Sequence, residues 1–202
     1  MNITRLAFAQ HPRPPQRELR QRRVFDSGGN LIGHVANVYA DDDGRFRFVA
    51  VTMGGLVGLG KRHHLIPVEA VAEEEPGSSI NLKVGRRTVE SVPALGDPDA
   101  APDGTMHVRI STMQVLEGHF DRVLHVLRTA LLPATEMQPG FCGGMLIENR
   151  DASEIVPASW WNSQERMEET ARCAHLPEEI AELALYLAGL PTVEHYQLDA
   201  LS

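Results

Sequence analysis

Hydrophobic and polar positions follow one pattern in the first half of the chain and a different one in the second half. From Val24 to Val92, short runs rich in β-branched residues are interrupted by Asp and Gly, and no long stretch repeats at the helical period. Short runs separated by turn residues are typical of the strands of a small barrel. We therefore expect an all-β unit in this part of the sequence.

One β-hairpin is predicted within this unit. Strand-like positions at 31–39 are followed by the turn Asp41-Asp42-Asp43-Gly44, in which the glycine suits a positive φ. Residues 46–53 then alternate as side chains do on the two faces of a returning strand. The glycine-rich segment 54–60 lacks the Lys-Ser/Thr ending of a phosphate-binding loop and precedes no helix, so it is interpreted as a barrel corner.

After Thr105 the pattern changes to a mixture of strands and helices. The predicted strands span 107–113, 141–148, 155–160 and 193–198; one helix spans 120–131, a second starts at a cap formed by Asn162 with Glu165, and a third runs from Pro177 to a stop at Gly189. This order indicates an α+β sandwich with helices on one face of an antiparallel sheet. A length of 202 residues suits two such units.

The chain divides into four segments. They are a basic N-terminal arm at 1–23, the β unit at 24–93, an acidic, proline-containing linker at 94–105 and the α+β unit at 106–202.

Charge narrows the choice of partners. The formal net charge is −8, whereas the six Arg and one Glu of residues 1–23 give the arm +5, which leaves −13 for the remainder. An acidic body argues against binding along nucleic acid, although the arm suits contact with nucleic acid, an anionic membrane or the acidic body itself. No apolar stretch is long enough to cross a membrane or direct export. We expect a cytoplasmic protein without membrane insertion.

Metal and disulfide chemistry find little support in the sequence. Cys142 and Cys173 are the only cysteines, and two isolated thiols are more typical of ordinary packed residues than of a bridge. His34, His63 and His64 lack a carboxylate or cysteine that would complete a ligand set, and adjacent strand residues point to opposite faces. We therefore predict no metal site and no cofactor.

Residues 26–71, DSGGNLIGHVANVYADDDGRFRFVAVTMGGLVGLGKRHHLIPVEAV, resemble the PRC-barrel family. The resemblance rests on the D-x-x-G-x-x-I-G-x-V opening, the hairpin with an acidic turn, the glycine corner and the I-P-x-x-x-V closing strand. Members of that family include a reaction-centre subunit and a ribosome-maturation factor. The resemblance therefore implies a docking or adaptor module, with an unknown protein partner.

Residues 107–201 are similar to the antibiotic-biosynthesis monooxygenase superfamily of ferredoxin-like, dimeric α/β barrels. The similarity rests on the opening strand and helix, the turn Gln138-Pro139-Gly140-Phe141, the Trp160-Trp161 strand end and the closing Glu194-His195-Tyr196 strand. It implies a homodimer that pairs its sheets and hides an otherwise bare apolar face. The haem-degrading type uses an Asn on the first strand, which residues 107–113 lack, and a helix His, whereas His175 falls at a helix tail.

Candidate site residues come from the faces of the predicted strands. Arg109 and His119 are candidate catalytic residues, because either side chain can stabilise an anion formed in a pocket. Trp160, Trp161, His107 and His195 are candidate pocket residues, since they converge if their strand faces line one cavity.

Three functions remain open from the sequence. The favoured hypothesis is a dimeric adaptor that binds a small molecule or a protein partner without catalysis. The alternative is a cofactor-independent monooxygenase acting on an aromatic small molecule. Association with RNA or the ribosome ranks lower, because the body of the protein is acidic.

Overall fold

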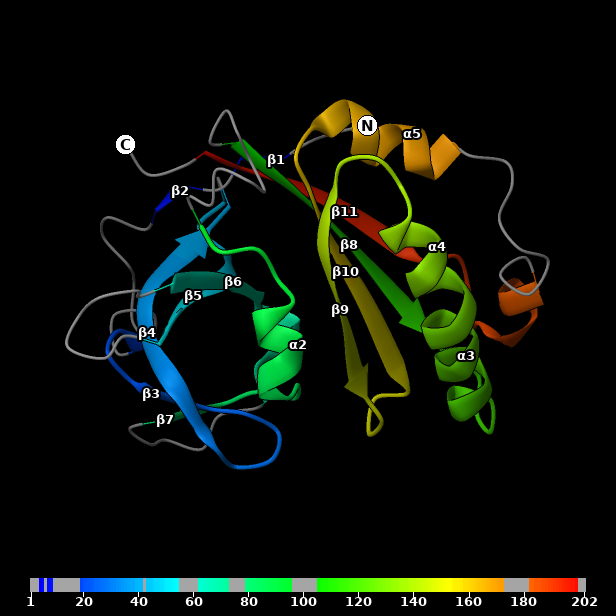
Figure 1. Ribbon diagram of the computed structural model, residues 1–202. Helices are drawn as coiled ribbons and strands as arrows, with labels where there is room; N and C mark the ends of the chain where they lie inside the picture. The colour runs from blue at the N-terminus through cyan, green and yellow to red at the C-terminus, as the bar shows by residue number, and fades with distance from the viewer. Residues whose placement is uncertain are drawn as a thin grey trace.

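The computed structural model describes residues 4, 5, 7, 8, 19–41, 43–54, 62–72, 79–95, 105–172 and 182–199. It has three layers (Figure 1): a β barrel, a twisted sheet through the middle of the molecule, and helices on the far side of that sheet. The mixed α+β class, with a barrel followed by a ferredoxin-like unit, is thereby confirmed.

The barrel is built from short strands that pair mainly with their neighbours in sequence. They are β3 (Arg23–Phe25), β4 (Leu31–Ala40), β5 (Phe46–Met53), β6 (Arg62–Pro67) and β7 (Ser79–Asn81), in the order β6-β5-β4-β3-β7. A 3-10 turn, η1 (Val68–Ala70), follows β6, and a short helix, α2 (Arg86–Glu90), follows β7. Helix α2 was not expected, because five residues are too few to show a helical period.

The predicted hairpin is confirmed as the β4–β5 pair. Asp41 holds its turn: the Arg45 amide donates to Asp41 Oδ1 at 2.8 Å, and Gly44 adopts a φ of 75°. Strand β5 is buried on both faces, from Phe48 to Val51 without interruption. A strand with no solvent-exposed face must be covered from outside the barrel as well as from inside. The predicted corner at 54–60 lies outside the described residues, apart from Gly54.

The second unit has four antiparallel strands in the order β11-β8-β10-β9. They are β8 (Thr105–Gln114), β9 (Phe141–Asn149), β10 (Glu154–Trp161) and β11 (Thr192–Asp199). Helices follow β8 and β10, which gives the β-α-β-β-α-β order of a ferredoxin-like fold. Three of the four predicted strands are confirmed to within one residue at either end, and β8 begins two residues before the predicted start at 107.

The first helix of this unit is longer than predicted. It runs through α3 (Phe120–Val126), a π-helical segment η2 (Leu127–Leu131) and α4 (Leu132–Glu136), so the expected end at Pro133 was wrong. Proline lacks an amide hydrogen and its ring crowds the carbonyl four residues earlier, but Pro133 lies in the first turn of α4, just after the widened π turn. The helix therefore continues past the proline.

The later helices also differ from the prediction. Helix α5 (Gln164–Arg172) is capped by Ser163, whose Oγ accepts from the Arg166 amide at 3.3 Å, and not by Asn162. Residues 173–181, with Cys173, His175 and the predicted start at Pro177, lie outside the described residues. The described remainder is a 3-10 turn, η3 (Leu183–Tyr186), which ends before Leu187 because that residue bridges to Val115.

Two short strands connect the N-terminal arm to both units. Strand β1 (Thr4–Arg5) pairs in parallel with β11, and β2 (Ala7–Phe8) pairs with β4. The arm therefore makes backbone contacts with the body of the protein at these four residues.

The barrel packs directly on one face of the second unit's sheet. The Phe48 and Tyr196 rings meet edge to face at 5.3 Å, and Arg47 bonds both Asp41 of the barrel and Glu194 of β11, at 3.0 and 3.2 Å. One continuous buried cluster includes barrel residues together with Val108, Ile110, Trp160, Tyr196 and other residues of the sheet. The two units therefore share a hydrophobic core.

The packing of the barrel on the sheet bears on the predicted homodimer. A second copy was expected to cover a bare apolar sheet face, but within the described chain the barrel already covers it. The homodimer stays a prediction, and this face is not the surface that would form it. No helix in the described residues has both the length and the apolar character needed to cross a membrane.

Gly143 tests the contact between barrel and sheet. A Cβ at this position would lie 2.4 Å from the Ser91 carbonyl oxygen and 2.8 Å from Pro93 Cδ, so Gly143→Ala should force α2 and its following loop away from β9. Overpacking of this kind lowers the free energy of unfolding by about 1–3 kcal/mol, measured by urea denaturation.

Gly189→Ala is the matched control. Gly189 is exposed, its φ lies outside the left-handed region, and an added Cβ would meet nothing within 4 Å. Its free energy of unfolding should change by no more than roughly 0.5 kcal/mol. Equal effects of the two substitutions would contradict close packing at Gly143.

Candidate functional site

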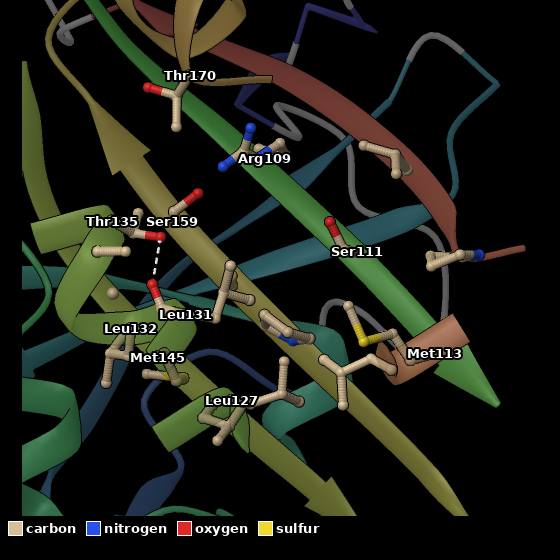
Figure 2. Close-up of a pocket in the computed structure, with 18 of the residues that line it drawn as sticks. Arg109, Ser111, Met113, Leu127, Leu131, Leu132, Thr135, Met145, Ser159 and Thr170 are labelled. Carbon is tan, nitrogen blue, oxygen red and sulfur yellow. Dashed lines mark hydrogen bonds between the residues drawn. The ribbon is translucent and has the colours of Figure 1, made fainter. Parts of the chain in front are cut away.

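A pocket of about 400 Å³ lies between the sheet of the second unit and the helices that cover it. Strands β8 to β11 supply its floor, and the segment from Leu127 to Gln138 and the turn η3 supply the opposite wall. Figure 2 shows polar side chains gathered toward the α5 end of the pocket and leucine and methionine side chains toward the other. A volume of this size is typical of sites for small molecules.

Three polar side chains cross the pocket floor in one row. Arg109 on β8 is the register partner of Ser159 on β10 and of His195 on β11. Directly opposed residues of neighbouring strands share one face of a sheet, with their Cβ atoms about 5 Å apart. The backbone register therefore presents the three side chains to the same end of the pocket.

Arg109 is the half-buried cation of this row. Within the described parts of the chain it forms no ion pair, and its guanidinium lies 5.5 Å from the centre of the Trp161 ring. Burial lowers the pKa of Arg109 from its ordinary value. The guanidinium nevertheless stays charged at neutral pH, since an arginine does not lose its proton in proteins.

Trp161 packs beside the polar row and forms a hydrogen bond with one of its members, Ser159. Its indole Nε1–H donates to Ser159 Oγ at 2.9 Å, and its ring meets Phe141 edge to face at 5.6 Å. Because Ser159 Oγ accepts this bond, its own hydroxyl hydrogen can point into the pocket. The fully buried Trp161 therefore contacts both Ser159 and Arg109.

His195 completes the row as a neutral side chain. It is only 7% exposed, and its Nε2 has no hydrogen-bond partner among the described residues. Burial, and to a lesser degree the charge of Arg109, holds the pKa of His195 below its ordinary value. A neutral imidazole can accept or donate one hydrogen bond through Nε2, according to its tautomer.

The opposite end of the pocket is apolar. Leu127 and Leu131 come from the π-helical segment, and Met113 and Leu146 come from the sheet. A π turn shifts the side chains that follow it around the helix axis, and such turns are frequent at functional sites. This end suits the hydrophobic part of a ligand.

The structure brings together only some of the residues predicted from the sequence. Arg109 and His195 line the pocket, and Trp161 lies behind Arg109 without lining it. Trp160 lies on the opposite face of the sheet, in the core shared with the barrel. His107 is buried beside Trp161 but does not line the pocket, and His119 stacks on Tyr186 at 4.9 Å, outside it.

Sequence reasoning missed Ser159, Ser111 and Thr170 as pocket residues. Ser111 shares a strand face with Arg109 at a spacing of two, so the alternation already contained its signal. Ser159 could be found only from the register between β8 and β10, and Thr170 only from the way α5 crosses the sheet.

A second cavity of about 420 Å³ lies between the barrel and the second unit. His64 is buried beside it, and its Nδ1–H donates to the Val92 carbonyl at 2.8 Å. Burial lowers the pKa of His64. Among the described residues, no three His, Cys, Asp or Glu side chains lie close enough together to hold a metal ion.

One known protein family matches part of the chain. Residues 15–89 match the family model of the PRC-barrel domain, which confirms the resemblance seen in residues 26–71. A search of curated proteins gave no match.

Three similar solved structures each cover just under half of this chain. One is described as an antibiotic biosynthesis monooxygenase, with 16% identity, 48% of this chain and 99% of that chain covered, and a TM-score of 0.40. Another is Rv0793 from Mycobacterium tuberculosis, with 18% identity, 45% of this chain and 91% of that chain covered, and a TM-score of 0.39. A third is a conserved protein from Methanosarcina mazei Go1, with 14% identity, 46% of this chain and 90% of that chain covered, and a TM-score of 0.40. Scores at this level carry no functional argument, so the fold of the second unit rests on its strand order.

Arg109 should reduce the stability of the protein without a ligand. A buried charge without a partner is unfavourable, so Arg109→Met should raise the free energy of unfolding by about 0.5–2 kcal/mol in urea denaturation. Arg47→Met is the matched control, because Arg47 bonds Asp41 and Glu194 and packs on Tyr196. That variant should lose about 1–3 kcal/mol. An equal loss in both variants would mean that Arg109 is structural.

Proposed function

We propose that this protein binds a small, largely apolar organic molecule in the pocket between the sheet and helices of its second unit. The observation that carries the proposal is the division of this pocket into an apolar end and a polar end where Arg109, Ser159 and His195 converge. Ligand sites are typically apolar cavities with a few convergent polar groups that fix orientation.

In this proposal the barrel has an adaptor role. A PRC-barrel match at residues 15–89 supports a docking module, and the contacts of Arg47 and Phe48 with β11 place that module against the sheet that floors the pocket. The protein partner, the homodimer and the cytoplasmic location stay predictions. RNA association ranks lower, because the net charge of −8 opposes phosphate binding.

Filling the pocket should weaken binding. Ser111 is half-buried on the pocket floor, so Ser111→Phe should reduce the affinity for the neutral fluorophore N-phenyl-1-naphthylamine at least about tenfold, measured by fluorescence titration. Thr112→Phe is the matched control, since the next residue of β8 points to the opposite face.

Either of two results would contradict the proposal. The first is the absence of fluorophore binding by the unaltered protein, and the second is equal binding by both variants. Circular dichroism and thermal unfolding of each variant establish that it is folded before binding is compared.

The second candidate function is cofactor-independent oxygenation of an aromatic molecule. It is favoured by His195, whose Nε2 has no hydrogen-bond partner among the described residues. A neutral imidazole beside Arg109 suits removal of a phenol proton, with the guanidinium holding the phenolate. One 1-naphthol and one O2 would then give one 1,4-naphthoquinone and one water. An oxygen electrode should record consumption that His195→Gln abolishes; consumption equal to the rate without enzyme would exclude this activity for naphthol.

A further inference from the structure

We propose that the ligand is a small monoacid, ionised at neutral pH, whose carboxylate binds between Arg109 and Ser159 while its hydrocarbon part fills the leucine-lined end. The inference rests on the proposed function, because it names the chemical class that the same pocket selects.

The charged side chains that line the pocket favour an anion. Arg109 is the only permanent cation among the described lining residues, and none of those residues is Asp or Glu. A charge taken out of water costs several kcal/mol unless a partner offsets it. Among the described residues, the recorded partner of the guanidinium is the ring face of Trp161, so a carboxylate from the ligand would supply the missing negative charge.

The hydrogen-bonding groups also fit a carboxylate. A carboxylate only accepts hydrogen bonds, and a guanidinium presents a planar fork of donors that matches its two oxygens. Ser159 has its hydroxyl hydrogen available because Trp161 Nε1–H already bonds to its oxygen. Donors from two paired strands, β8 and β10, therefore serve one site.

A single negative charge fits better than a double one. One guanidinium balances one carboxylate, whereas the second charge of a phosphate dianion would find no further permanent cation among the described lining residues. A neutral ligand would leave Arg109 without a partner. The cavity of about 400 Å³ admits acids the size of octanoate or 2-naphthoate.

Two acid and alcohol pairs test the inference on the full chain. Octanoate is compared with 1-octanol, and 2-naphthoate with 2-naphthalenemethanol, each competing with N-phenyl-1-naphthylamine in the unaltered protein, Arg109→Met and Arg109→Lys. We expect at least one acid to bind about 10- to 100-fold more tightly than its alcohol. Arg109→Met should remove this preference while leaving alcohol binding within about threefold, and Arg109→Lys should retain part of it.

The outcomes distinguish a failure of this inference from a failure of the proposed function. Binding of the neutral fluorophore with no preference for either acid, or a preference that survives Arg109→Met, overturns the inference and leaves the proposed function in place. Failure of the fluorophore to bind overturns both. A loss of acid binding in Arg109→Met with unchanged alcohol binding supports both.

Discussion

The central constraint on this protein is that both faces of one four-stranded sheet are apolar and a single chain must cover both. Strands β8 to β11 carry Val108, Ile110, Trp160 and Tyr196 on one face, which the barrel covers. On the other face, Ile155 packs under the helices together with Val123 and Leu127. A sheet fixed from both sides holds its register, and the register determines which side chains share the pocket floor.

We expect Arg109 to reduce the stability of the folded protein when no ligand is bound. A medium-sized apolar side chain would fit the same face with no charge to bury. Instead the chain keeps a guanidinium on the face of Trp161, and Trp161 in turn orients Ser159. Groups that raise the free energy of a folded protein concentrate at binding sites, where a ligand compensates for them. The pocket is therefore better explained by ligand binding than by stability.

Much of the fold could be predicted from the sequence, because period-two alternation and turn residues are local signals. They located β4, β5 and the four strands of the second unit, and they placed Arg109 on one face with Ser111. Local patterns do not contain the pairing between distant strands. That is why Trp160 and Trp161 looked equivalent, although one packs under the barrel and the other behind Arg109. The covering of the sheet by the barrel, and the helix that continues past Pro133, likewise depend on tertiary packing and a π turn.

The most direct measurement is a crystal structure of the full chain grown with 2-naphthoate. We expect a carboxylate bonded to the Arg109 guanidinium and to Ser159 Oγ, with the rings against Leu127 and Leu131 and the barrel in place on the opposite face of the sheet. An empty pocket in which Arg109 turns to an acidic side chain of the protein would contradict this expectation, as would naphthoate bound with its carboxylate away from Arg109.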